Sequence, residues 1–223
     1  MVALVFPALP TVTLPVTGRA ERFPVRRIFC VGRNYAEHTK EMGGDPDRET
    51  PFFFTKPADA VVESGSRIPY PPATQNLHHE GELVVAIGKS GAMVSEEGAQ
   101  AMIWGYAAGN DLTRRDLQAE AKERRRPWDM AKGFDKSAVV GPIRPGPLPG
   151  RRLRCVVNGA VRQEASTDEM IWSPASIIAA LSQLVSLSPG DLIFTGTPAG
   201  VGPLNRGDTC KVEGLQPATV TIA

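Results

Sequence analysis

The chain has 223 residues, of which 42% are hydrophobic and 22% charged, and these fractions are typical of a soluble globular protein. Its formal net charge of +1 at pH 7 gives no broad positive field for nucleic acid or an anionic membrane surface. The composition therefore excludes partners recognised by overall charge. It predicts one domain over 1–223, with residues 1–25 as an N-terminal extension packed on it.

Two further features, the cysteines and the N-terminus, predict a cytoplasmic protein, and a third bears on nucleic-acid binding. The three cysteines, Cys30, Cys155 and Cys210, are isolated and odd in number, which argues against a disulfide framework or a zinc knuckle. Prolines interrupt the apolar N-terminus, and no stretch approaches the ~20 apolar residues that a membrane helix needs. The basic run over 122–126 is interrupted by Glu123, so we interpret it as a solvated helix end and not as a nucleic-acid patch.

The predicted elements are short, because 22 glycines and 20 prolines are spread along the chain. In chain order they are strands at 28–31, 52–55 and 82–87, a short helix from Ser95, a strand at 103–110, a helix from Thr113 to about Arg124, a strand at 153–157, a helix from Ser173 through Leu184, and strands at 191–195 and 219–222. The Thr113 hydroxyl is expected to cap the amide of Asp116. Strands and helices do not alternate regularly, which favours a β-rich α+β fold with a mixed, mostly antiparallel sheet.

Two carboxylates, Glu80 and Glu82, stand at the start of the apolar strand 82–87. The two-residue repeat of a strand places both on one face, where two like charges need a counter-cation. Carboxylate oxygens suit Mg²⁺, Mn²⁺ or Ca²⁺, whereas zinc more often recruits histidine or cysteine. The alternative is an exposed strand end with incidental acids.

A third acid, Asp111, ends the predicted strand 103–110 just before the predicted helix. Together with Glu80 and Glu82 it would complete a magnesium-type site that leaves positions open for substrate oxygens. Asp111 could instead cap the helix that begins near Thr113.

His38 and Glu41 are spaced three residues apart in the segment after the first strand. In a helix they would be neighbours on one face, so that the carboxylate orients the imidazole and the pair can deprotonate water. The alternative is a polar pair on a surface turn. Further along the chain, the glycine-rich stretch at 190–202 could hold a carboxylate, but it lacks the lysine and the pattern of a phosphate loop and could also be a plain turn.

Six of these segments, in the same order, resemble the fumarylacetoacetate hydrolase family across nearly the whole chain from Ile28 onward. His38 and Glu41 accompany the first of them. The segments are Val31-Gly32-Arg33-Asn34-Tyr35, Pro51-Phe52-Phe53-Phe54-Thr55-Lys56-Pro57, His79-Glu80-Gly81-Glu82-Leu83, Gly109-Asn110-Asp111-Leu112-Thr113, Ala131-Lys132-Gly133-Phe134-Asp135 and Thr195-Gly196-Thr197-Pro198.

The resemblance implies a mixed β-sandwich roll, a Mg²⁺ or Mn²⁺ ion, a 2-oxo acid substrate and a homodimer. By matching position it implies that the metal ligands are Glu80, Glu82 and Asp111. The catalytic residues that it implies are His38, Glu41 and Lys132. The substrate contacts that it implies are Arg115, Gln118, Lys56 and Thr197. Arg114 lies next to Arg115, so the sequence leaves open which guanidinium faces the site.

Within the family, residues 33–47 and 52–60 are most similar to bacterial fumarylpyruvate hydrolases of the gentisate route. The resemblance thus implies hydrolysis of the carbon–carbon bond of an acylpyruvate. Oxaloacetate decarboxylases and isomerases or decarboxylases of oxo-diene diacids share the scaffold, so the metal ligands do not choose among them. The pair His38 and Glu41 favours a hydrolase, because decarboxylation does not require activated water. Two non-enzyme alternatives are a metal-binding module and a calcium-stabilised extracellular domain.

Overall fold

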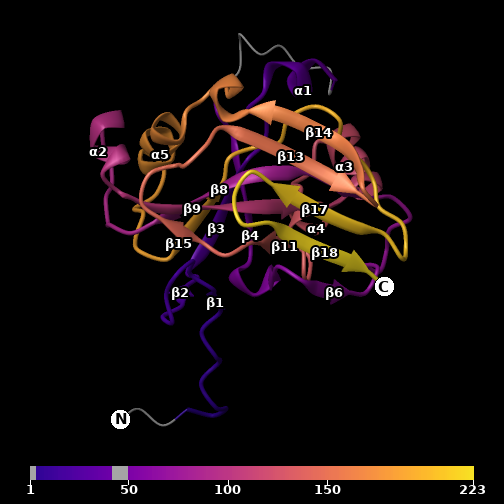
Figure 1. Ribbon diagram of the computed structural model, residues 1–223, viewed down its shortest axis with the longest axis horizontal. Coiled ribbons are helices and arrows are strands. Elements are labelled where there is room, and N and C mark those ends of the chain that lie inside the picture. Colours follow the sequence, from indigo (N-terminus) through magenta and orange to yellow (C-terminus); the bar gives the residue numbers. More distant parts are fainter. Residues whose placement is uncertain (1–3, 42–49) are drawn as a thin grey trace.

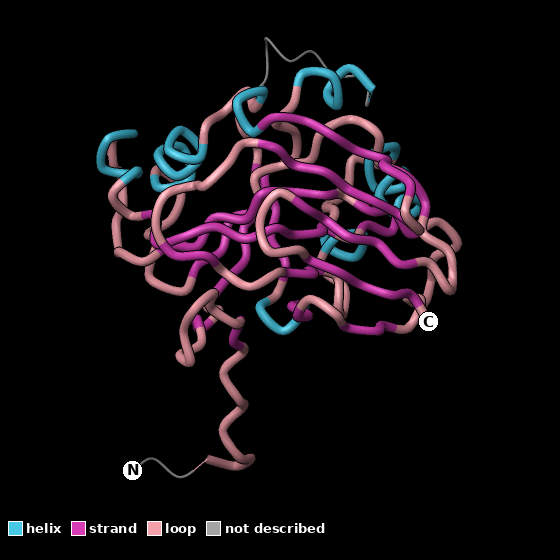
Figure 2. The backbone as a smooth tube through the Cα atoms, in the orientation of Figure 1, coloured by secondary structure: helices cyan, strands magenta, loops and turns pink. Residues whose placement is uncertain are grey.

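The computed structural model of the chain describes residues 4–41 and 50–223, apart from the side chains of residues 39–41. Two curved β-sheets pack face to face and form the body of the molecule, with the helices around them (Figures 1 and 2). Among the residues described, no helix is both long and apolar enough to span a membrane. The expected β-rich α+β fold, a mixed β-sandwich roll with a few short helices, is confirmed.

The larger sheet has the strand order β4-β3-β15-β8-β9-β11-β5, with β12 paired to β9. Its strands are β3 (Arg27–Val31), β4 (Phe53–Lys56), β5 (Val61–Glu63), β8 (Gly81–Ile87), β9 (Ile103–Asp111), β11 (Ala138–Val140), β12 (Arg144–Pro145) and β15 (Asp191–Phe194). The pairs β3–β15 and β5–β11 are parallel and the other pairs are antiparallel. The five strands predicted in this region are all present, with ends shifted by at most one residue.

The second sheet lies in front of the first in Figure 1 and has the order β14-β13-β17-β18-β6. Its strands are β6 (Ser66–Ile68), β13 (Arg152–Val157), β14 (Ala160–Ser166), β17 (Thr209–Glu213) and β18 (Ala218–Ile222). Only β13 and β18 were predicted. A small sheet of β10 (Thr113–Arg114), β7 (Leu77–His79) and β16 (Gly202–Pro203) joins loops near the ends of β8 and β9, and β1 (Thr13–Leu14) pairs with β2 (Phe23–Pro24).

Side chains of the central strand β8 alternate between two buried faces. Leu83 and Val85 pack against helix α5 (Pro174–Ser182), whereas Val84 and Ala86 face the N-terminal segment. A third cluster lies between the two large sheets and includes side chains of β9, β11, β13, β17 and β18. Because both faces of the larger sheet are covered, its central strand is a continuous apolar run.

The helices are short, and α5 covers part of one face of the larger sheet. They are α1 (Ala36–Glu41), α2 (Glu96–Gln100), α3 (Arg115–Glu123), α4 (Asp129–Lys132) and α5, with 3-10 turns at Ala58–Ala60 and Thr167–Glu169. Helix α5 begins as predicted, since Ser173 accepts the amide of Ser176 and a proline follows the cap. The predicted cap at Thr113 is wrong, because its hydroxyl donates to the Asp111 carbonyl (3.0 Å) and α3 begins only at Arg115.

The N-terminal segment has two parts. Leu14, Val16 and Phe23 are buried in the core beneath β8. Residues 4–11 are exposed, and in Figure 1 they run away from the body of the molecule. The N-terminal segment therefore contacts the core from Val12 onward, and the single domain over 1–223 stays a prediction.

Candidate metal centre and active site

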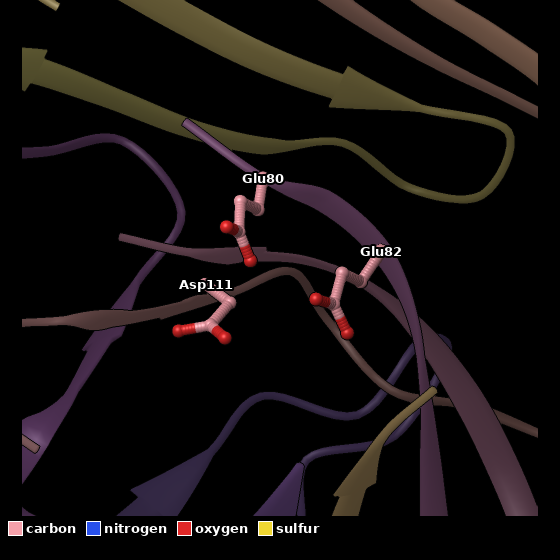
Figure 3. Close-up of side chains that lie close together, drawn as sticks. All are labelled: Glu80, Glu82 and Asp111. Atoms are coloured by element: carbon pink, nitrogen blue, oxygen red, sulfur yellow. The ribbon is translucent and has the colours of Figure 1, made fainter. Parts of the chain in front are cut away.

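Three carboxylates converge where β8 and β9 meet. The side chains of Glu80, Glu82 and Asp111 point toward one another (Figure 3), and one oxygen of each lies within 4.8 Å of the others. Asp111 is 0% exposed, Glu82 is 1% exposed and Glu80 is 5% exposed. Three carboxylates this close and this far from water require cations beside them.

The strand register explains the convergence. Glu80 lies between β7 and β8, and Glu82 follows two residues later on the same face. In the antiparallel pair β8–β9, Gly81 is opposite Asn110, so Asp111 lies beside Glu80 and donates its amide to the Glu80 carbonyl (2.9 Å). The alternative of an exposed strand end is therefore wrong for the glutamates, and Asp111 does not cap α3.

Lys132, at the end of α4, supplies positive charge to the cluster. Its Nζ lies 2.7 Å from Glu80 Oε2 and 2.7 Å from Asp111 Oδ2, and it donates to the Thr113 hydroxyl at 2.7 Å. The side chain is almost completely buried. Thr113, which the sequence predicts to cap a helix, thus accepts a hydrogen bond from Lys132.

Lys56 lies on the other side of Asp111. Its Nζ is 2.7 Å from Asp111 Oδ1 and donates to the backbone carbonyls of Leu112 (3.2 Å) and Lys132. These contacts place its ammonium behind the aspartate. Its assignment as a substrate contact stays a prediction, and the contacts present are those of a group that orients Asp111.

Arg115 is the arginine that faces the site. Its Nη2 lies 2.5 Å from Glu80 Oε1, and its Nη1 donates to Gln118 Oε1 at 2.6 Å. Arg114 instead stacks on the ring of Phe134, with its Cζ 4.3 Å from the centroid. Of the two neighbouring arginines, Arg115 is thus the one beside Glu80, and Gln118 lies next to it.

Burial and neighbouring charges shift the pKa values of Glu80 and Glu82 in opposite directions. Burial alone would raise the pKa of Glu80, but Lys132 and Arg115 outweigh it and hold that pKa far below its ordinary value. The pKa of Glu82 is raised well above its ordinary value by burial and by the negative charges of Asp111 and Glu80. Glu82 accepts the Gly196 amide at 2.7 Å, which offsets only part of this effect.

This donor set fits a hard divalent cation. It offers three carboxylates on one centre, where burial, together with the charges of Asp111 and Glu80, raises the pKa of Glu82. Asp111 Oδ1 is buried and accepts no hydrogen bond, although Lys56 is close. Oxygen-only ligands suit Mg²⁺ or Mn²⁺, and a small cation beside Glu82 would relieve the repulsion that raises its pKa.

The predicted water-activating pair lies on α1. His38 is 4% exposed and is among the groups that lower the pKa of Glu80, which places the imidazole near the cluster. Glu41 is the last residue of α1, but its side chain lies outside the described residues. The histidine is therefore brought to the site, and the dyad stays a prediction.

The glycine-rich stretch after β15 borders Glu82. Thr197 is 2% exposed and donates its hydroxyl to the Gly81 carbonyl at 2.9 Å, while Gly196 binds Glu82. The loop therefore fixes the segment that carries both glutamates. Thr197 as a substrate contact stays a prediction.

Lys122 is a cation near the site that the sequence does not single out. Within the basic run, Arg124 to Arg126 are exposed as expected, but Lys122 is half-buried with its Nζ 5.2 Å from the ring centroid of Trp128. Burial, together with Arg115 and Arg33, lowers the pKa of Lys122 to about 8. The signal available in the sequence was the four-residue spacing of Lys122 from Gln118, which places both on one face of α3.

Comparison with known proteins agrees with this geometry. The family model described as fumarylacetoacetate (FAA) hydrolase C-terminal matches residues 27–222. A fumarylpyruvate hydrolase of Ralstonia sp is 45% identical over 190 residues, covering 81% of this chain and 98% of that protein. The mitochondrial oxaloacetate tautomerase FAHD1 of Mus musculus is 44% identical over 187 residues, covering 82% of this chain and 84% of that protein.

A solved structure extends the match to three dimensions. It is the crystal structure of fumarylpyruvate hydrolase from Pseudomonas aeruginosa in complex with Mn²⁺ and pyruvate. The two chains are 46% identical with a TM-score of 0.96, and the match covers 99% of each. The chain belongs to the fumarylacetoacetate hydrolase family.

Proposed function

We propose that the protein hydrolyses the carbon–carbon bond of an acylpyruvate in a reaction that depends on Mg²⁺ or Mn²⁺. Fumarylpyruvate is the proposed substrate, and fumarate and pyruvate are the products. The observation that carries the proposal is the buried carboxylate triad with Lys132 between Glu80 and Asp111. Similarity to the fumarylpyruvate hydrolases of Ralstonia sp and Pseudomonas aeruginosa supports the choice of substrate.

In this proposal Glu80, Glu82 and Asp111 hold the divalent ion. When bound, the ion supplies Lewis acidity to the carboxylate and 2-oxo oxygens of the substrate. Arg115 and Gln118, which are hydrogen-bonded to each other, are positioned to bind the substrate beside Glu80.

His38, oriented by Glu41, takes a proton from water, and the resulting hydroxide attacks the distal ketone carbon of the substrate. The carbonyl electrons move to the ketone oxygen, and the Lys132 ammonium stabilises that negative charge. When the carbonyl re-forms, the bond to the pyruvate methylene breaks, and its electron pair leaves with pyruvate as the enolate. The proton that His38 took from water passes to that carbon and gives pyruvate, and the acyl group leaves as the carboxylic acid.

The charge balance favours an anionic substrate. Glu80, Glu82 and Asp111 carry three formal negative charges, which Lys56, Lys132 and Arg115 balance. A divalent ion would then leave the site positive, and Lys122 lies close enough to Glu80 and Arg115 for their charges to affect its pKa. A dianionic 2-oxo acid would compensate that charge.

A second candidate is chemistry on oxaloacetate. It is favoured by the identity of 44% with the mouse oxaloacetate tautomerase FAHD1. Tautomerisation or decarboxylation needs the metal and a proton-transfer group but no attacking water. The predicted pairing of His38 with Glu41, which would activate water, favours the hydrolase.

The test compares the two substrates on one preparation of metal-loaded protein. Loss of the enol absorbance of fumarylpyruvate is followed together with the release of pyruvate and fumarate, and oxaloacetate is assayed for tautomerisation and decarboxylation. The proposal expects kcat/KM for fumarylpyruvate to exceed that for oxaloacetate, and expects His38→Ala to abolish only the hydrolysis. Faster turnover of oxaloacetate, with no hydrolysis of fumarylpyruvate, would establish the second candidate.

We extend the proposal to a cytoplasmic homodimer that acts in the breakdown of aromatic compounds through gentisate. The bacterial relative named fumarylpyruvate hydrolase supports the pathway. Light scattering of the purified protein would give its mass, and a monomer at micromolar concentration would contradict the dimer.

A further inference from the structure

Gln163 is a buried polar side chain that comes from the sheet opposite the metal centre. It lies on β14, at the edge of the five-stranded sheet, and is 2% exposed. Of the buried polar side chains in the described residues, Gln163 alone comes from that sheet. Burying an amide costs free energy unless its donors and acceptors are satisfied, so its partners are informative.

The amide of Gln163 bridges two segments of the site. Its Oε1 accepts the Gly81 amide at 2.9 Å and lies 3.1 Å from His79 Nδ1. Its Nε2 donates to Thr197 Oγ1 at 2.7 Å and to the Pro198 carbonyl at 2.8 Å. One side chain therefore links the backbone between Glu80 and Glu82 to the loop that binds Glu82.

Thr197 closes this network, because its hydroxyl donates to the Gly81 carbonyl at 2.9 Å. Both backbone polar groups of Gly81 are thus held by Gln163 and Thr197. The preceding amide, that of Glu80, is held by Asn110 Oδ1 at 3.0 Å. The stretch that presents both glutamates is fixed by side chains from β9, β14 and the loop after β15.

A β-bulge in β14 lies directly before Gln163. Cys155 pairs with Gln163 and the next residue, Val156, pairs with Val161, so Arg162 is an extra residue in a β-bulge. Bulges re-aim neighbouring side chains and are frequent beside active sites. Arg162 is exposed and Gln163 points inward.

The loop approaches the bulge closely at Gly200. A Cβ at this position would collide with the carbonyl oxygen of Arg162, and the φ of Gly200 is +93°, which favours glycine. The bulge, the glycine and the glutamine together hold the loop at 195–200 against the second sheet.

We propose that Gln163 is a positioning residue of the metal centre, which fixes the Glu80–Glu82 segment relative to the Thr197 loop without touching metal or substrate. This inference rests on the proposed function in taking the acidic triad as the metal site. It assigns the second sheet a part in catalysis, because that sheet sets the spacing of ligands that β8 and β9 carry. Groups that orient metal ligands typically contribute roughly 10- to 100-fold to metal affinity or activity.

The experiment measures Mn²⁺ binding to metal-depleted protein, by the loss of the free-ion electron paramagnetic resonance signal. Gln163→Met keeps the length of the side chain and removes its four polar contacts. Gln183→Met is the matched control, because Gln183 is exposed and makes only a 3.5 Å contact to the Ala179 carbonyl. Circular dichroism identifies folded variants, and kcat and KM are measured on the loaded proteins.

Gln163→Met is expected to raise the dissociation constant for Mn²⁺ by about 10-fold or more and to lower kcat, while Gln183→Met binds as the wild type does. Thr197→Val removes the hydroxyl of the same network and provides a second variant should Gln163→Met fail to fold. It is expected to weaken Mn²⁺ binding in the same direction. In the double variant, the loss of Mn²⁺ binding free energy should be smaller than the sum of the two single losses, because both side chains bind Gly81.

The outcomes separate this inference from the proposed function. Wild-type affinity for Mn²⁺ in folded Gln163→Met, or in folded Thr197→Val where the first variant does not fold, would overturn the positioning role and leave the metal centre in place. A wild-type chain that does not bind Mn²⁺ would overturn the metal centre and this inference with it. A variant that loses thermal stability but keeps wild-type affinity would show a role in folding only, which also contradicts the proposal.

Discussion

Lys132 stands between two carboxylates of the triad, with its ammonium 2.7 Å from each. Burial alone would lower its pKa, but Asp111 and Glu80 raise it, so the side chain is held charged. A single ammonium therefore both stabilises the acidic cluster and is available to stabilise charge in a substrate. Its effects on stability and on turnover are separable by experiment.

We predict that Lys132→Met destabilises the metal-free protein by about 3–5 kcal/mol, since it leaves Glu80 and Asp111 buried with less compensation. Saturating Mn²⁺ should recover part of this loss, because the ion compensates the carboxylates that Lys132 no longer neutralises and so stabilises the variant more than the wild type. Urea unfolding in EDTA and in Mn²⁺ measures both quantities, with the exposed Lys89 replaced by methionine as the control. An equal deficit with and without Mn²⁺ would contradict the prediction.

Glu82 gives the site a pH dependence. Its pKa is raised by burial and by Asp111 and Glu80, so protons compete with the metal at higher pH than an ordinary carboxyl group would allow. The metal binds the deprotonated carboxylate, and we therefore expect Mn²⁺ affinity to fall as pH decreases toward the raised pKa of Glu82. Calorimetric titration between pH 8 and pH 5 tests this. Affinity that stays constant over this range would refute it.

At the scale of elements, α5 depends on its apolar face. Ile178 is 0% exposed and packs in the cluster against β8, so Ile178→Ala should lower the free energy of unfolding by about 2–5 kcal/mol. Leu184→Ala, just beyond the same helix and 69% exposed, should change it by less than about 0.5 kcal/mol. Equal losses in the two variants, measured by urea unfolding, would contradict the packing described.

The elements that could be predicted from the sequence are those with a local signal. The helix at Ser173 has a cap and a proline, and β8 is a continuous apolar run. Strand β14 lacks such a signal, because it has only two buried side chains, Gln163 and Ala165, and its pairing is interrupted by the bulge. The Thr113 hydroxyl was assigned to a cap because its true partners, Asp111 and Lys132, depend on tertiary contacts.

In the whole molecule, the site is assembled from segments that are distant along the chain. The positions of Glu80, Glu82 and Asp111 followed from strand periodicity and strand ends, which are local properties. The approach of Lys132 followed only from the family resemblance, since no spacing relates α4 to β8. The contact of Gln163 with Gly81 crosses between the two sheets and could not be inferred from either segment alone.

The central claim is that the carboxylate triad supports metal-dependent hydrolysis of an acylpyruvate. The measurement that tests it most directly is a titration of metal-depleted protein with Mn²⁺ during turnover of fumarylpyruvate, with fumarate and pyruvate quantified. We predict no turnover in EDTA, activity that saturates at one Mn²⁺ per chain, equal amounts of the two products, and no recovery in Asp111→Asn. Undiminished turnover in EDTA, or full activity of Asp111→Asn, would contradict the account.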